Sequence, residues 1–156
     1  MNTLDFTAAH KRKLETNALA NVSYIFEHAP GDLALPLYDS KVAAGYPSPA
    51  ADHVKKRLKA DDYLVKNETA TFYVQVEGDS MKDAGIFHGD ILVVDRSLEA
   101  HIGSIVVAEI EGKFTVKFLG HNELIPANAD FETIKFKDGE TVLLAGVVTG
   151  SMRKFV

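Results

Sequence analysis

Cysteine is absent from this chain of 156 residues. Its absence excludes disulfide scaffolds, zinc sites built on thiolates and cysteine nucleophiles. The six histidines are scattered along the sequence and show no short spacing of the kind that holds a metal ion. We therefore expect neither a dedicated metal site nor a cofactor.

Long hydrophobic runs and concentrated positive charge are also missing. The longest apolar runs, such as residues 91–94, are far below the ~20 residues that span a bilayer, and the N-terminal residues contain no apolar core of the signal-peptide type. We therefore expect a cytoplasmic protein without membrane contact. The net charge is −5, and the basic clusters at residues 10–13 and 55–57 are short. This balance argues against direct, sequence-specific DNA binding, which needs several phosphate-neutralising side chains on one face.

The chain divides near residue 45 into two stretches whose hydrophobic patterns differ. Residues 14–26 have apolar side chains at helix-like spacing, which predicts a helical piece within an otherwise extended arm. Ser48 and Pro49 are typical of a helix start and predict a second short helix, with Val54 and Leu58 on one face. The arm is too short for a helix-turn-helix domain with its own core, so we expect it to dock on another surface.

From residue 69 onward the pattern becomes that of β-strands. Phe72, Val74 and Val76 alternate with polar residues, as in a half-buried strand. Glu111 and Gly112 stand between two apolar runs and predict a two-residue hairpin turn. Further strands are predicted at residues 90–95, 104–110, 113–119, 123–125 and 141–149. The sequence therefore predicts a mostly β fold: a compact antiparallel β domain, preceded by an extended, partly helical N-terminal arm.

Two residues are candidates for nucleophilic chemistry. Ser80, in the sequence Gly-Asp-Ser-Met, directly follows a predicted strand, so its hydroxyl could project from the sheet while nearby N–H groups converge as an oxyanion hole requires. The alternative is a turn serine that bonds its own backbone. Lys117 shares one face of its predicted strand with Thr115 and Leu119. The alternative for this lysine is solvent exposure.

A serine hydroxyl becomes nucleophilic only beside a base, and no Ser/His/Asp arrangement is evident here. His88 stands on a turn and is interpreted as a surface residue. A lysine can be the base only when it is neutral, so its pKa of about 10.4 must fall by roughly 3 units, or about 4 kcal/mol. Burial in an apolar pocket provides shifts of that size. Lys117 is therefore a candidate base on the condition that it is buried.

Four motifs resemble the LexA/UmuD family of self-cleaving serine–lysine peptidases, in the family's order and at its serine-to-lysine spacing. They are residues 78–86 (GDSMKDAGI), 88–95 (HGDILVVD), 114–117 (FTVK) and 124–128 (LIPAN). Upstream, residues 44–52 (AGYPSPAAD) resemble the cleavage region of the UmuD branch. The resemblance covers most of the chain, from about residue 35 to residue 150.

The resemblance implies the fold of the family's C-terminal domain and a role for each motif residue. Ser80 would attack the carbonyl of Ala44, and Lys117 would take the serine proton and later protonate the leaving amine of Gly45. The backbone N–H groups of Asp79 and Ser80 would hold the oxyanion. The alternative for Ala44 and Gly45 is a hinge of small, flexible residues.

The resemblance also implies a division of the chain and a set of partners. Residues 1–44 would be an arm removed by self-cleavage, and residues 45–156 would be the peptidase-like domain. The RecA–single-stranded DNA filament would stimulate cleavage, and the trimmed homodimer would act with a UmuC-like polymerase in translesion synthesis during SOS mutagenesis. Two alternatives stay open: a non-proteolytic interaction module of the same fold, and a LexA-type regulator without a typical DNA-binding domain. Residues 1–30 depart from the family pattern, because the arm is longer than in the UmuD branch.

Overall fold

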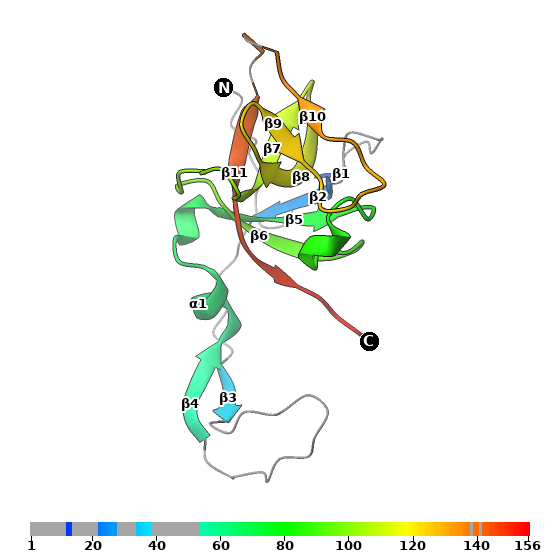
Figure 1. Ribbon diagram of the computed structural model, residues 1–156. Helices are drawn as coiled ribbons and strands as arrows, with labels where there is room; N and C mark the ends of the chain where they lie inside the picture. Colours follow the sequence, from blue (N-terminus) through cyan, green and yellow to red (C-terminus); the bar gives the residue numbers. More distant parts are fainter. Residues whose placement is uncertain (1–11, 14–21, 28–33, 39–53, 138, 141) are drawn as a thin grey trace. The chain divides into compact units, whose positions relative to one another are not determined.

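The computed structural model describes residues 12–13, 22–27, 34–38, 54–137, 139–140 and 142–156, which fold as two units (Figure 1). The larger unit joins residues 1–28 to residues 67–156, and the smaller one comprises residues 29–66. Among the described residues, strands dominate and the one α-helix, α1 (Ala60–Leu64), is short. The prediction of a mostly β, antiparallel fold is confirmed.

The larger unit is built on one antiparallel sheet of nine strands. Two 3₁₀ turns accompany the sheet, at Glu68–Ala70 before β5 and at Lys82–Ala84 after it. The strand order across the sheet is β1 (Arg12–Lys13), β2 (Val22–Glu27), β5 (Thr71–Val76), β6 (Ile91–Asp95), β11 (Leu143–Met152), β7 (Ile105–Ile110), β8 (Lys113–Leu119), β9 (Glu123–Ile125) and β10 (Ile134–Lys135). The smaller unit contains an antiparallel pair, β3 (Ala34–Tyr38) with β4 (Val54–Lys59), which runs directly into α1.

Strand β11 connects the two halves of the large sheet. Its first half pairs with β7 and its second half with β6, and Val147 has a partner on each side. The register shifts near Gly146, where an added Cβ would lie 2.7 Å from Val94 Cγ1 and 2.9 Å from the carbonyl oxygen of Asp95. Glycine therefore permits the close approach of backbones at the point where the strand changes partner.

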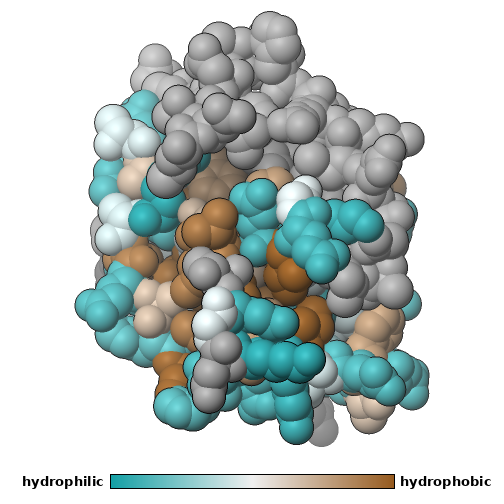
Figure 2. Space-filling view, turned by 90° about the horizontal axis from the view of Figure 1, so that it is seen from above, coloured by the Kyte–Doolittle hydropathy of each residue, from teal (hydrophilic) through white to brown (hydrophobic). Residues whose placement is uncertain are grey.

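The sheet carries a packed cluster on each face. One cluster includes Phe114 and Val116 of β8, and the other includes Val106 and Ala108 of β7. Because side chains alternate along a strand, Lys117 lies on the face of its cross-strand partner Val106. Hydrophobic side chains gather near the middle of the face seen in Figure 2, among hydrophilic ones.

The turn between β7 and β8 has the geometry that its sequence predicts. Ile110 pairs with Lys113 across the turn, and the two central residues, Glu111 and Gly112, have φ of 50° and 74°. Positive φ at both central positions is the mark of a type I′ turn, whose twist matches that of the flanking strands. The two-residue hairpin is therefore confirmed, and it sets the register that places Lys117.

The strands predicted from residue 69 onward are confirmed, with shifted ends for some of them. The two helix predictions are wrong where the structure describes them: residues 22–26 belong to β2, and Val54 and Leu58 belong to β4. Residues 14–21, Ser48 and Pro49 lie outside the described residues. Helix-like spacing in a short apolar segment does not separate helix from strand, and here pairing with β5 and β3 decides the outcome. In the described part of the chain, no helix is long and apolar enough to cross a membrane.

Candidate active site

Ser80 lies in a tight turn that follows β5. Gly78 has φ of 83°, a value that favours glycine, and its N–H donates to Nδ1 of His88 at 3.1 Å. Met81 is buried in the core cluster of the sheet and anchors the far side of the turn. Ser80 itself is only 3% exposed. The turn is thus fixed at both ends. His88 is exposed, as the sequence predicts, and it also has a structural role because it accepts a hydrogen bond from this turn.

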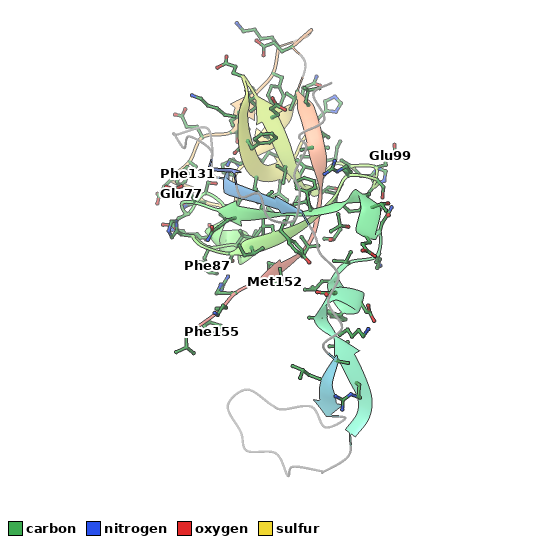
Figure 3. The ribbon with its side chains drawn as sticks, turned by 180° about the vertical axis from the view of Figure 1, so that it is seen from behind. Glu77, Phe87, Glu99, Phe131, Met152 and Phe155 are labelled. Atoms are coloured by element: carbon green, nitrogen blue, oxygen red, sulfur yellow. The ribbon has the colours of Figure 1, made fainter. Side chains whose placement is uncertain are left out.

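The loop after β9 braces the same turn. The carbonyl oxygen of Asp79 accepts a hydrogen bond from Nδ2 of Asn128 at 3.0 Å and another from the N–H of Lys82 at 3.1 Å. Asn128 is 6% exposed, and the neighbouring Ala127 accepts from the N–H of Asp83 at 2.8 Å. Figure 3 shows Phe131, from the same loop, and Glu77, which precedes the turn, at one end of the unit.

The brace on the Asp79 carbonyl has a consequence for Ser80. In a trans peptide the C=O and the N–H of one plane point in opposite directions. Because two donors hold the Asp79 carbonyl oxygen, the N–H of Ser80 in the same peptide plane is held in a single orientation. The structure therefore pre-orients one of the two backbone donors that the sequence motif suggests for an oxyanion hole.

Lys117 is buried on β8 and points its amine at Ser80. Its Nζ lies 2.9 Å from Ser80 Oγ, 2.8 Å from Thr115 Oγ1 and 3.0 Å from the carbonyl oxygen of Val116. Only 5% of the residue is exposed, so the alternative of a solvent-exposed strand lysine is excluded. Thr115 lies two residues earlier on the same strand, so the alternation of side chains places both on one face.

Burial lowers the pKa of Lys117 from 10.5 to about 8. The cause is desolvation, which disfavours the charged ammonium in a poorly solvated site. At pH 7 a lysine with this pKa is neutral in about one molecule in ten, against about one in three thousand for an ordinary lysine. The three oxygen neighbours can accept from the three N–H groups of a charged ammonium, and a neutral amine can donate to two of them and accept from the Ser80 hydroxyl through its lone pair.

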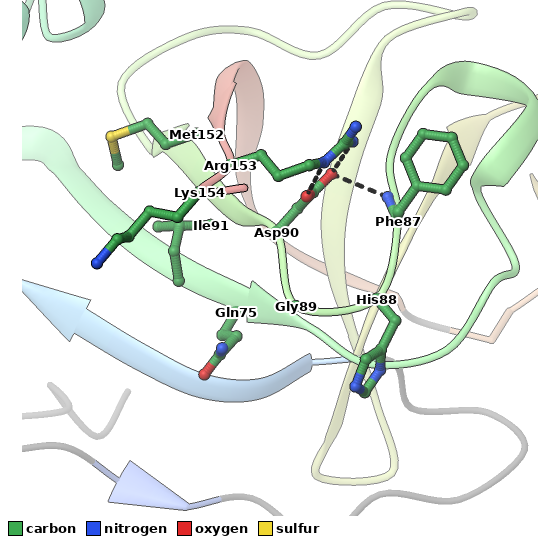
Figure 4. A pocket seen from close by; sticks show the side chains of 9 residues that line it. All are labelled: Gln75, Phe87, His88, Gly89, Asp90, Ile91, Met152, Arg153 and Lys154. Carbon is green, nitrogen blue, oxygen red and sulfur yellow. Dashed lines mark hydrogen bonds and ion pairs between the residues drawn. The ribbon is translucent and has the colours of Figure 1, made fainter. Parts of the chain in front are cut away.

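A pocket of about 660 Å³ lies apart from this pair, lined by Gln75, residues 87–91 and residues 152–154 (Figure 4). Arg153 donates to both carboxylate oxygens of Asp90 at 2.6 Å, and its guanidinium lies 4.4 Å from the ring centre of Phe87. The hydrogen bonds from Arg153 lower the pKa of the buried Asp90 carboxyl. This clamp ties the end of the chain to the segment that follows the Ser80 turn.

The structure thus brings Ser80, Asp79 and Lys117 together, across 37 residues of sequence. Ala44 and Gly45 lie outside the described residues, so the cleavage site stays a prediction. Thr115 and Asn128 were not assigned a role from the sequence. The alternation of β8 places Thr115 on the face of Lys117 but gives it no role, and only the folded loop brings Asn128 to this turn. The described residues contain no group of three or more histidine or acidic side chains that could hold a metal ion.

Comparison with known proteins gives consistent matches. The model of the peptidase S24-like family matches residues 36–149. Protein MucA of Salmonella typhimurium is 45% identical over 123 residues, which cover 76% of this chain and 84% of MucA. Protein SamA of the same species is 38% identical over 131 residues, covering 82% and 91% of the two chains. The LexA repressor of Azoarcus sp. is 44% identical over 126 residues, covering 78% of this chain and 61% of the repressor.

Proposed function

Because the chain belongs to the peptidase S24-like family, we propose that it is a serine endopeptidase that cuts its own backbone between Ala44 and Gly45. The matches also confirm the resemblance to the LexA/UmuD family that the sequence motifs carry. One observation carries the proposal. Lys117 Nζ lies 2.9 Å from Ser80 Oγ at a buried position, and its pKa of about 8 leaves a substantial neutral fraction near physiological pH.

In the proposed reaction, the first half transfers the acyl group to the enzyme. Ser80 Oγ attacks the carbonyl carbon of Ala44 while its proton moves to the neutral amine of Lys117. The N–H groups of Asp79 and Ser80 stabilise the oxyanion of the tetrahedral intermediate. The C–N bond then breaks, and the ammonium of Lys117 gives the proton to the leaving amine of Gly45. An ester joins Ser80 to Ala44 at this stage.

The second half restores the enzyme. Lys117, neutral again, takes a proton from a water molecule, and the resulting hydroxide attacks the ester carbon. The intermediate collapses, the proton on Lys117 returns to Ser80 Oγ, and Ala44 leaves as a carboxylic acid that loses its remaining proton to solvent. The substrate is part of the same chain, so tethering raises its effective concentration. A base that activates Ser80 only slowly is therefore sufficient for cleavage. Thr115 Oγ1 and the Val116 carbonyl oxygen keep the amine aimed at Ser80 throughout.

We propose the biological setting on the strength of the family resemblance. Cleavage would occur in the response to DNA damage, with the RecA–single-stranded DNA filament as the stimulating partner. The trimmed form, residues 45–156, would form a homodimer and join a UmuC-like polymerase in translesion synthesis. The removal of an arm is a local event that changes which surfaces a protein presents.

The test is incubation of the purified full chain between about pH 9 and 10, where a lysine with a pKa of about 8 is neutral. Mass spectrometry should identify two fragments, residues 1–44 and 45–156. Addition of RecA and single-stranded DNA at neutral pH should accelerate the same cut. Ser80→Ala should stay intact under both conditions. The protease assignment fails if the wild-type chain stays intact in both, or if Ser80→Ala is cut at the same bond.

A further inference from the structure

The residues that precede the proposed cut contribute strands to both units of the structure. Strand β2 pairs antiparallel with β5 in the larger unit. Strand β3 pairs antiparallel with β4 in the smaller unit. Both β2 and β3 lie before residue 44, whereas β5 and β4 lie after residue 45. A cut at this bond would therefore break the backbone without breaking either ladder.

Strand β5 depends on β2 for its outer neighbour. Its other side is paired with β6, so in the absence of β2 the outer row of N–H and C=O groups of β5 would have no strand beside it. In Figure 1, β2 runs alongside β5 on the side away from β6. The register pairs Ile25 with Val74 and Val22 with Val76. Val74 and Val76 are fully buried core residues, so this edge belongs to the main core of the unit.

We infer that the outer edge of β5 (Thr71–Val76) is a strand-binding surface, and that β2 occupies it both before and after cleavage. The inference rests on the proposed cut at Ala44–Gly45. After that cut, residues 1–44 stay bound as a non-covalent fragment, and the edge opens only when this fragment leaves. The surface fits an extended, antiparallel strand with apolar residues at the register positions of Val74 and Val76, because β2 has that pattern.

The fragment has two points of attachment, which is why it should be retained. Dissociation requires loss of the β2–β5 ladder and of the β3–β4 ladder, and the two are joined by residues 28–33. When one ladder opens, the other holds the loose strand at high effective concentration beside its site. Release of the arm is therefore a step separate from cleavage, and it controls when the β5 edge becomes available to another strand.

The experiment makes the cut independently of the chain's own chemistry. In a full-length chain carrying Ser80→Ala, residues 43–46 are replaced by the recognition sequence of a site-specific protease, and the added protease makes the cut. The two fragments should then co-elute on a gel-filtration column under native conditions and separate in urea. Their separation under native conditions at micromolar concentration would overturn the inference. Because no self-cleavage is needed, this outcome does not depend on whether the proposed reaction occurs.

Two matched variants of the same nicked chain test whether β2 is the strand that retains the fragment. In Tyr24→Pro with Ile25→Pro, one of the two prolines removes an N–H that faces β5, because adjacent residues of an antiparallel strand point their N–H groups to opposite sides. Fragment release should become about tenfold faster or more. The control is Arg12→Pro with Lys13→Pro in β1, which pairs with β2 and not with β5. Equal release rates in the two variants would refute the role of β2.

A labelled peptide tests whether the edge accepts a strand in trans. A synthetic peptide of residues 20–29 should bind the nicked chain that carries the proline pair in β2. It should bind the nicked chain with intact β2 at least about tenfold more weakly, because that edge is already occupied. A peptide of the same composition in scrambled order should not bind either chain. Equal binding of the ordered and scrambled peptides would show that the edge has no strand specificity, contrary to the inference.

Discussion

Substitution of Lys117 by methionine should make the protein more stable at neutral pH while removing its proposed chemistry. The pKa of this lysine falls from 10.5 in the unfolded chain to about 8 in the folded one. Below about pH 8 the folded state must hold a charge in a poorly solvated site, so the depressed pKa lowers the stability there. As the pH rises from about 8 to 10.5 this penalty disappears, because the unfolded lysine then loses its proton too.

The magnitude follows from the size of the shift. A difference of 2.5 pK units is worth about 3 kcal/mol at pH 7 and about 1 kcal/mol at pH 10. Methionine has a similar length and no charge, and it leaves the hydroxyl of Thr115 and the carbonyl of Val116 without the amine, which costs about 1 kcal/mol for each lost hydrogen bond. The loss of these hydrogen bonds lowers the stability by the same amount at both pH values. The informative quantity is therefore the change in the stability difference between pH 7 and pH 10.

The assay is urea unfolding of Ser80→Ala and of Ser80→Ala with Lys117→Met, at both pH values. The Ser80→Ala background prevents self-cleavage in either chain. The free energy of unfolding of the methionine variant minus that of its parent should be about 2 kcal/mol larger at pH 7 than at pH 10, which means a greater gain in stability at pH 7. If the difference does not change with pH, Lys117 has an ordinary pKa and the reasoning is refuted. The other lysines titrate equally in both chains and cancel.

Three further substitutions probe the site and its supports, and a fourth probes the fold. Lys117→Arg should abolish self-cleavage even at high pH, since a guanidinium stays protonated; a retained cut would exclude Lys117 as the base. Asn128→Ala should slow cleavage roughly tenfold to a hundredfold without moving the midpoint of its pH profile, because it loosens a backbone donor and not the base. Arg153→Ala should lower the thermal midpoint, most strongly above the pH range in which Asp90 titrates and less in acid, where the carboxylate is protonated. Gly146→Ala should cost about 1–3 kcal/mol in urea unfolding, whereas no loss would show that the backbones can move apart.

The sequence predicts the sheet from residue 69 onward well, because alternation and turn residues act there over short distances. The type I′ turn at Glu111 and Gly112 is one example, since its residues meet the φ requirement locally. The burial of Lys117 was beyond prediction from its own strand, where Thr115 and Leu119 fit either face. Its burial depends on segments that meet it only in the folded chain, among them the turn of Ser80, which is 37 residues away in the sequence.

The N-terminal strands show the opposite case. Residues 22–26 have apolar side chains that satisfy a helical spacing as well as a strand, and the choice is made by β5, which offers an edge about 50 residues later. The role of Asn128 is equally non-local. Its side chain acts on the carbonyl of Asp79, which lies 49 residues before it and belongs to a different turn. Both features depend on which segments meet in space, and local sequence patterns do not contain that information.

The pH dependence of self-cleavage by the intact chain tests the central claim most directly, because it reports the ionisation of the base during the reaction itself. With Lys117 as a buried base, the first-order rate should rise tenfold per pH unit at low pH, bend at about pH 8 and reach a plateau. A rate that continues to rise through pH 10, or one that does not depend on pH, would contradict the assignment of Lys117 as the base that activates Ser80.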